Sequence, residues 1–360
     1  MRLLDRYILG KFLTTYFFVV VILVSIVSII TFSERNENFI KNDVSTIEIL
    51  EYFMNFAPYM ANLITPLTVF IAAVFVTSKL AGHTEIIAIL AGGVSFTRLM
   101  RPYFMGAMII AILSFVFTGW IIPNANKSRV AFEQKYFEDN TYNFSDRDVH
   151  FKVSPTSYVY LASYNSFKDE GHRFTLEEIQ NKEVVYKLSA RLIRWDSTEN
   201  GWKARDWNIR TFKELGEDYQ YENIRDTLLH LNMTPSDFTN NKDLEQTLTL
   251  NELNDYIANL ELKGADNIQI YRIEKYIRFM SPFSALILTF IGVIVSSRKT
   301  RGGVGFQIAI GFLIAFIFII LFIASKSMAE TGSINPLLAV WMPNIVFSGV
   351  AMLMYKIVPK

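Results

Sequence analysis

The feature that most constrains this chain of 360 residues is a set of six apolar stretches that contain no charged residue and no histidine. Each is about 20 residues long, the length that an α-helix needs to cross the hydrocarbon core of a bilayer. They occupy residues 12–32, 57–78, 103–122, 279–297, 304–325 and 337–355. Since 51% of the residues are hydrophobic and only 19% are charged, we predict an α-helical membrane protein with three spans on either side of a polar insert.

The short segments between these stretches predict the orientation of the chain. Lys and Arg gather before the first stretch, between the second and third, between the fourth and fifth, and after the sixth, whereas the first connecting segment is acidic. Because positively charged loops stay in the cytoplasm, both termini are expected there and the insert on the opposite side. The first stretch is too long for a signal peptide and no cleavage site follows it, so we interpret it as an anchor.

The insert, residues 123–276 between the halves 1–122 and 277–360, has the pattern of an all-β domain outside the bilayer. From Val149 onward apolar and polar residues alternate, as they do in half-buried strands. Residues 183–195 and 202–212 are rich in β-branched and aromatic residues, and the segment that joins them ends in Asn200-Gly201. An Asn-Gly pair between two such runs predicts an antiparallel hairpin.

The end of the insert predicts one short helix. Thr249 and Glu252 have the spacing of a capping box, and Gly264 can end the helix. One apolar face then follows at helical spacing, formed by Leu250, Leu253, Ile257 and Leu260.

Three tryptophans of the predicted strands allow two interpretations. Trp195, Trp202 and Trp207 can pack the core of the sheet, which is the usual place of an aromatic side chain in a strand. Alternatively, a sheet that is open along one edge presents them to a lipid acyl chain. The sequence does not separate these two roles.

Residues 83–92, between the second and third stretches, have the pattern of a short amphipathic helix. Thr84 can cap its start, Glu85 lies in the first turn, where the helix dipole favours an acid, and Gly92-Gly93 can end it. The polar side near His83 carries no Lys or Arg, which helices on a membrane surface usually have. The apolar stripe is predicted to be free, and to enter either a groove of a partner protein or the membrane interface; it is formed by Ile86, Ile89 and Leu90.

No motif in the chain supplies energy or catalysis. A phosphate-binding loop of the type Gly-x-x-x-x-Gly-Lys-Ser/Thr is absent, and so are the ionisable residues that ion-driven transporters keep inside their spans. The chain has no cysteine, and its four histidines show neither metal-ligand spacing nor a Ser/His/Asp set. We therefore predict no catalytic residue, no metal site and no cofactor bound by this chain, and any work on a substrate must come from another chain.

The charge balance excludes one class of partner. Lys and Arg total 35 and Asp and Glu total 34, so the chain has no excess positive charge with which to bind nucleic acid.

The fifth stretch contains small and aromatic residues that each allow two roles. Small residues four apart let membrane helices approach closely, but they are also common in spans generally. Phe312 and Phe316 can line an apolar lipid cavity or face bulk lipid. The pairs at this spacing are Gly305 with Ala309 and Gly311 with Ala315.

Five short fragments follow one another along the chain: LDRYI at residues 4–8, TE at 84–85 with AGGVS at 91–95, Trp120 with Pro123, SPFS at 281–284, and NP at 335–336 with Pro343. Each is weak alone. Their order and spacing over the whole chain, together with the three-plus-three arrangement of spans, resemble the lipopolysaccharide-export permease family LptF/LptG. The opening fragment is nearer to LptG.

This resemblance implies a half-permease of an ATP-driven, ABC-type exporter in the bacterial inner membrane. Such a subunit would extract lipopolysaccharide and pass it to a periplasmic bridge toward the outer membrane, and the insert would be a periplasmic β-jellyroll. The implied partners are a cytoplasmic LptB-like ATPase dimer that holds ATP and magnesium, a second half-permease (LptF-like or a second copy) and a bitopic LptC-like subunit. Glu85 matches the acidic residue that the family places in a groove of the ATPase dimer.

One position departs from the family pattern. LptG-like members tend to carry a basic residue near the outer end of the first span, suited to lipid A phosphates, and Thr31 stands there in this chain. We expect Arg35 and Lys41, which are nearby, to take over the phosphate contact. The alternative function is a membrane-anchored interaction or sensor protein with a β domain and no transport role.

Overall fold

The structure is a computed structural model that describes residues 3–137, 145–154, 156–165, 168–180, 183–213, 216–222, 226–231, 233–235, 243–263, 268–297 and 303–357. The chain divides into two compact units. The helical unit comprises Met1–Phe137, Glu245–Asn254 and Gln269–Lys360, and the β unit comprises Glu138–Leu244 and Asp255–Ile268.

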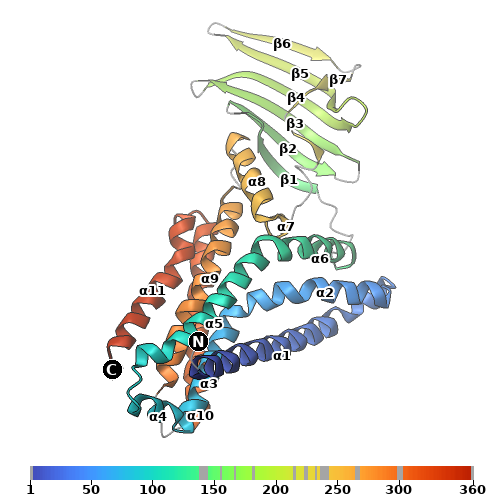
Figure 1. The fold of residues 1–360 in the computed structure, drawn as a ribbon. Helices are drawn as coiled ribbons and strands as arrows, with labels where there is room; N and C mark the ends of the chain where they lie inside the picture. The colour runs from blue at the N-terminus through green and yellow to red at the C-terminus, as the bar shows by residue number, and fades with distance from the viewer. Residues whose placement is uncertain are drawn as a thin grey trace. The chain divides into compact units, whose positions relative to one another are not determined.

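Helices make up the first unit (Figure 1). Among the described residues six helical segments are long and apolar enough to cross a membrane, namely α1, α3, the segment from α5 to α6, α9, α10 and α11. This finding and the antiparallel sheet between the third and fourth spans confirm the predicted fold class. The helices are α1 (Leu3–Lys41), α2 (Thr46–Leu63), α3 (Thr65–Gly82), α4 (Glu85–Ala91), α5 (Phe96–Val116), the π-helical turn η1 (Phe117–Ile121), α6 (Ile122–Tyr136), α7 (Leu244–Thr247), α8 (Leu250–Lys263), α9 (Ile268–Ser296), α10 (Gly303–Glu330) and α11 (Pro336–Ile357).

Helix α3 is the centre of the helical unit. Its side chains Val69, Phe70 and Val74 are buried in one apolar core that also takes residues from α1, α5, α9, α10 and α11. Small residues let the neighbours approach: a Cβ on Gly292 of α9 would lie 3.1 Å from the Cβ of Ala73. The two predicted halves therefore form one body around α3.

The predicted second span, residues 57–78, was wrong as one continuous helix. Two helices meet at Ile64, which ends α2 and begins α3. Pro66 stands in the first turn of α3, where its missing N–H and fixed φ are tolerated. The acidic connection before it is also largely helical, because α1 continues to Lys41 and a complete capping box at Ser45 and Glu48 starts α2.

The predicted third span also continues beyond residue 122. The π-helical turn η1 joins α5 to α6, and Pro123 falls in the first turn of α6, so the helix does not end there. The helical unit accordingly extends to Phe137, whereas the insert was expected to begin at residue 123.

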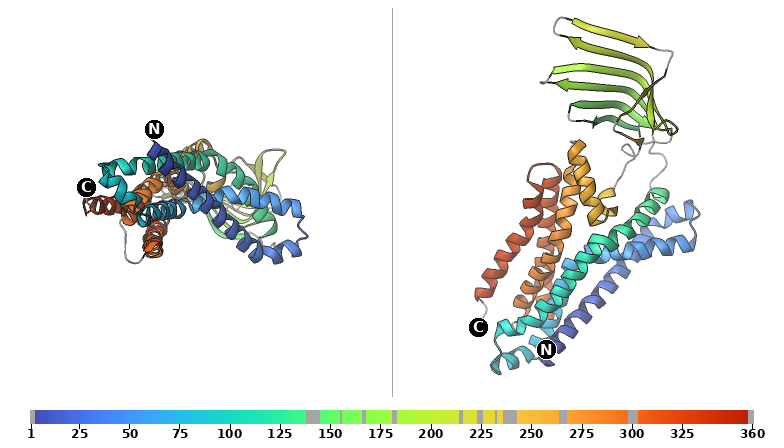
Figure 2. Two further views of the ribbon diagram at one scale, coloured as in Figure 1. Left: turned by 60° about the horizontal axis from the view of Figure 1, so that its bottom comes forward. Right: turned by 45° about the horizontal axis from the view of Figure 1, so that its top comes forward.

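Helix α4, the start of α1 and the end of α11 lie at the same end of the helical unit. Figure 1 and the right-hand view of Figure 2 agree on this placement. Helices α1, α5 and α11 thus each have one end close to the short connection that contains α4.

The described strands of the β unit form one antiparallel sheet. Its order is β1-β2-β3-β4-β5-β6, and β7 also pairs with β5. Successive strands are neighbours, as in a meander (Figure 1). The strands are β1 (Ser145–Lys152), β2 (Ser157–Asn165), β3 (Glu170–Gln180), β4 (Glu183–Asp196), β5 (Gly201–Lys213), β6 (Gly216–Glu222) and β7 (Thr227–Leu229).

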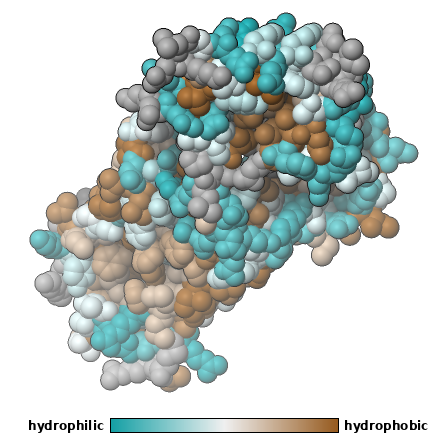
Figure 3. Space-filling model, turned by 90° about the horizontal axis from the view of Figure 1, so that it is seen from above, coloured by the Kyte–Doolittle hydropathy of each residue, from teal (hydrophilic) through white to brown (hydrophobic). Residues whose placement is uncertain are grey.

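The predicted hairpin is confirmed by β4 and β5. Trp195 pairs with Trp202 in the register of these strands, and Asn200 in the turn has a φ of 48°, the left-handed conformation that Asn tolerates. Trp202 is fully buried and donates its indole N–H to the carbonyl of Met233 at 2.9 Å. Trp195 and Trp207 are partly buried and pack against the same core, so the core role is confirmed for Trp202. Figure 3 shows hydrophobic side chains gathered in a patch of the unit, bordered by hydrophilic ones.

The predicted short helix is confirmed as α8. The carboxylate of Glu252 accepts from the backbone N–H of Thr249 at 2.7 Å, and the Thr249 hydroxyl accepts from the backbone N–H of Glu252 at 3.4 Å. Its four predicted apolar residues are all buried. Gly264, the predicted end, lies outside the described residues.

Candidate functional site

Helix α4 is the strongest candidate site, and its ends are set by backbone conformation. Gly93, with a φ of 81°, follows the helix and ends it in the way that glycine does. Thr84 was predicted to cap the start with its side chain, and this was wrong. Thr84 has a φ of 62°, and its hydroxyl donates to the carbonyl of His83 at 2.6 Å. A β-branched residue with this left-handed backbone conformation is rare and strained, so the packing around the turn must hold Thr84 in it.

The predicted apolar stripe is not free. Ile86 is 2% exposed and belongs to the core around α3, and Ile89 and Leu90 pack against that core. The prediction failed because the sequence shows which face of a helix is apolar but not whether the chain itself covers that face. These three residues anchor α4 to the helical unit.

The outward face of α4 is a different one. Ile87 is 55% exposed, and it stands at helical spacing with Thr84, Ala88 and Ala91, which are exposed as well. We call these four residues the outer face of α4. The exposure of Ile87 was not predicted, although the i, i+3, i+4, i+7 spacing of these small or apolar residues was a readable signal.

Polar contacts tie α4 and its neighbour to the start of α1. The Tyr7 hydroxyl donates to Oε2 of Glu85 at 3.3 Å. Lys11 contacts Tyr7, both by a hydrogen bond to its hydroxyl and over its ring. In α5, Nη2 of Arg98 donates to the buried carboxylate of Asp5 at 2.7 Å.

These contacts join the start of α1 to the helix α4 and to the start of α5. Asp5 is buried, and a buried carboxylate that lost its Arg98 partner would carry a large desolvation cost. A continuous series of contacts therefore runs from α4 to α1 and α5; it consists of Ile86, the Tyr7–Glu85 bond and, at the start of α5, the Arg98–Asp5 pair.

The predicted phosphate contacts lie near the far end of α1. Thr31 is partly buried, Arg35 is exposed with its guanidinium over the ring of Phe137 at 4.9 Å, and Lys41 is the exposed last residue of the helix. Arg35 and Lys41 are therefore on one helix but six residues apart.

The small residues of α10 separate into two groups. Gly311 and Ala315 are buried, and a Cβ on Gly311 would come within 2.9 Å of the Phe70 ring of α3. Gly305 and Ala309 are exposed, as are Phe312 and Phe316. Among the described residues, Gly311 and Ala315 are therefore the pair of α10 that packs closely within the chain.

The described residues contain no candidate metal site. Within those ranges no group of three or more His, Asp and Glu side chains could hold a metal ion.

The model of the family described as lipopolysaccharide export system permease LptF/LptG matches residues 6–356. The chain belongs to the LptF/LptG family. The match covers both spanning halves and the insert, which confirms the predicted family, and LptF and LptG are not distinguished by it. No curated protein matches the chain.

Membership in the LptF/LptG family indicates the general function of the chain. It implies a lipopolysaccharide-export permease, hence a transport subunit rather than an enzyme. It also implies a multi-pass protein of the inner membrane that works with partners in an export complex.

Proposed function

We propose that this chain is one half-permease of an ATP-driven lipopolysaccharide exporter, and that the outer face of α4 binds a cytoplasmic ATPase dimer. The observation that carries this proposal is the exposure of Ile87 beside Glu85 on a helix whose opposite side is anchored in the core by Ile86. An exposed apolar residue next to a carboxylate, on a rigid support, suits a small groove of a partner protein. ATP and magnesium would be held by that partner, not by this chain.

The coupling step would use the contacts around α4. When the ATPase dimer closes, it would displace α4, and the displacement would pass through the Tyr7–Glu85 bond and the core to α1. The Arg98–Asp5 pair would keep the starts of α1 and α5 together during this movement. Since α1 and α5 also pack on each other through Phe12 and Tyr103, whose ring centroids are 5.6 Å apart, the spans would move as a group.

In this proposal both termini and α4 lie in the cytoplasm and the β unit in the periplasm. Positive charge at the end of the helical unit that holds α4 supports this orientation. The β unit would pass lipopolysaccharide to a periplasmic bridge, and a second half-permease and a bitopic LptC-like subunit would complete the complex.

The proposed contacts with the substrate follow from the charge and polarity of exposed side chains. Arg35 and Lys41, near Thr31, would bind the phosphates of the lipid, because exposed cations at the outer end of a span suit phosphate groups. Phe312 and Phe316 on α10 would face acyl chains, because exposed aromatic rings within a span meet only apolar surroundings.

The test is a pair of substitutions in the outer face and its carboxylate. Ile87→Glu is expected to lower the amount of ATPase that copurifies by about tenfold or more, which corresponds to a loss of about 1.4 kcal/mol in binding. Glu85→Ala is expected to reduce ATP-driven release of lipopolysaccharide from proteoliposomes by a similar factor. Both assays use the complete complex.

The matched control is Ile47→Glu, because Ile47 on α2 is even more exposed, at 78%, and also lies on a helix surface. It is expected to leave ATPase copurification unchanged. Normal copurification of the Ile87→Glu variant together with normal lipid release by the Glu85→Ala variant would refute the coupling role of α4.

A further inference from the structure

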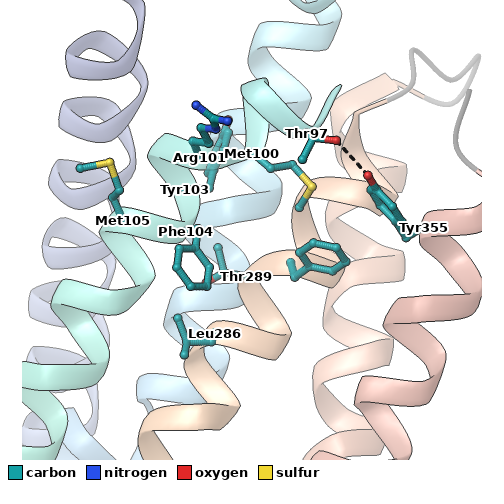
Figure 4. A pocket seen from close by; sticks show the side chains of 10 residues that line it. Thr97, Met100, Arg101, Tyr103, Phe104, Met105, Leu286, Thr289 and Tyr355 are labelled. Atoms are coloured by element: carbon teal, nitrogen blue, oxygen red, sulfur yellow. Dashed lines mark hydrogen bonds between the residues drawn. The ribbon is translucent and has the colours of Figure 1, made fainter. Parts of the chain in front are cut away.

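A cavity of about 360 Å³ lies between α5, α9 and α11 (Figure 4). Apolar side chains form most of its lining, including Met100 and Phe104 of α5 and Leu286 and Phe290 of α9. Its volume falls near the lower end of the roughly 300–1,000 Å³ typical of sites for small ligands. The cavity is separate from α4 and from the proposed phosphate contacts on α1.

Two contacts join α5 to its neighbouring helices, one at the cavity and one further along α5. At the start of α5 the hydroxyls of Thr97 and Tyr355 are 2.9 Å apart and share a hydrogen bond, which joins α5 to α11. Further along, the rings of Phe115 and Phe279 join α5 to α9 with centroids 5.6 Å apart. The cavity lies along the part of α5 between these two contacts, from Thr97 to Met105.

The positive charge of the cavity lining, that of Arg101, lies at one end of the cavity. Arg101 belongs to its lining and is exposed, and Figure 4 shows it with Thr97 and Tyr355 at one end and Leu286 at the other. Arg101 forms no ion pair with any residue in the ranges that the structure describes. Lys356, also exposed, follows Tyr355 in α11.

An apolar gap with a cationic end is complementary to an anionic phospholipid, which has apolar acyl chains and a negatively charged phosphate. Within a bilayer an open apolar cavity between helices is filled by acyl chains, and an arginine at the end of the spans binds phosphate with two parallel hydrogen bonds. We propose that this cavity binds one acyl chain of an anionic phospholipid whose phosphate is held by Arg101.

This lipid would be part of the working transporter and not its cargo. It would fill the gap between α5 and the α9–α11 pair and so keep the spacing of these helices constant. The binding site itself does not depend on the proposed export function; only its assignment to the cytoplasmic leaflet rests on the proposed orientation.

The experiment uses photo-crosslinking of the full chain in lipid nanodiscs. The discs contain equal amounts of alkyne-tagged phosphatidylglycerol and phosphatidylcholine with identical acyl chains, and p-benzoylphenylalanine replaces Phe104. The matched control places it at Ile112, since both positions are on α5 and have nearly equal exposure, 55% and 57%. We expect the ratio of phosphatidylglycerol to phosphatidylcholine label at position 104 to exceed that at position 112 about fivefold, which corresponds to about 1 kcal/mol.

Charge variants then test the role of Arg101. Arg101→Gln is expected to lower the ratio at position 104 to that at position 112, whereas Lys79→Gln, at the end of α3 and outside the cavity, is expected to leave it unchanged. Equal ratios at positions 104 and 112 would overturn the proposal. An unchanged ratio in the Arg101→Gln variant, or label at position 104 mainly on protein or on added lipopolysaccharide, would overturn it as well. The comparison of positions 104 and 112 decides the question even if Arg101→Gln fails to fold.

Discussion

The two units of this protein use apolar side chains in opposite ways. In the β unit Trp202 is fully buried, and the apolar residues of the inner strands converge on one core. In the helical unit Phe316 is 59% exposed, although it lies in the middle of a span without a charged residue. The first unit is built to keep water out of its core, whereas the second is surrounded by a medium as apolar as its own interior.

Because of this difference, different kinds of residue show how the interior of each unit is packed. In the helical unit the informative residues are polar, because a buried charge needs specific partners wherever it lies. Arg278 of α9 is such a case: it is buried, and its guanidinium bonds Glu274 and the carbonyls of Glu245 and Leu248. Asp5 with Arg98 is another. In the β unit the same information is carried by the apolar residues themselves.

The largest effect that tests this comparison is expected from removing a buried aromatic ring. Trp202→Ala should lower the unfolding free energy of the β unit by about 3–5 kcal/mol, because it leaves a cavity and removes the bond to Met233. Hydrogen exchange of the β4–β5 amides in the full chain measures this change. Phe316→Ala, measured on the α10 amides in detergent, should cost less than about 0.5 kcal/mol. Similar losses at both positions would break the comparison.

Elements that depend on local sequence could be predicted well. The hairpin of β4 and β5 follows from Asn200-Gly201 between two β-rich runs, and α8 follows from the capping box at Thr249 and Glu252. Both motifs act within a few residues, so no knowledge of the rest of the fold is needed. The family match confirms the wider prediction of three plus three spans with an inserted sheet.

The errors came from residues whose role depends on the whole fold. The break at Ile64 was missed because membrane helices tolerate proline, so Pro66 in an apolar stretch does not by itself indicate a helix end. The helix α6 was missed because hydropathy detects spans but not polar helices that continue them. Ile86 was assigned to a free stripe because burial by distant helices leaves no trace in the local sequence. Ile87 was overlooked although its spacing with Thr84, Ala88 and Ala91 marks a second face of the helix.

A medium effect is expected from small residues within one span. Gly311→Val should destabilise the helical unit by about 1–3 kcal/mol, because its Cβ would lie 2.9 Å from Phe70, which is itself buried. Gly305→Val should have little effect within the chain, since nothing lies within 4 Å of a Cβ there. The midpoint of unfolding by dodecyl sulfate measures both variants. A destabilised Gly305→Val variant would instead assign that glycine to a contact with another chain.

The smallest effect concerns ion pairs at the surface of the β unit, where water competes with every contact. Arg205 donates from Nε and Nη2 to the two carboxylate oxygens of Asp226, at 3.0 and 3.1 Å, and this hydrogen bonding lowers the pKa of Asp226. A carboxyl whose pKa is lower in the folded state stabilises that state above its unfolded pKa of about 3.9, and the gain is lost as the pH falls through the folded pKa. Both side chains are more than one third exposed, so screening limits the gain to about 0.2–1 kcal/mol.

Asp226→Asn should therefore lower the melting temperature of the β unit slightly at pH 7, and the two proteins should converge on acidification below about pH 4. Tryptophan fluorescence follows this transition in the full chain, since three of the five tryptophans, Trp195, Trp202 and Trp207, lie in the β unit. Added salt should reduce the difference at pH 7, because it screens exposed pairs. A difference that stays constant from pH 7 to below pH 4 would mean that Asp226 acts through packing and not through its charge.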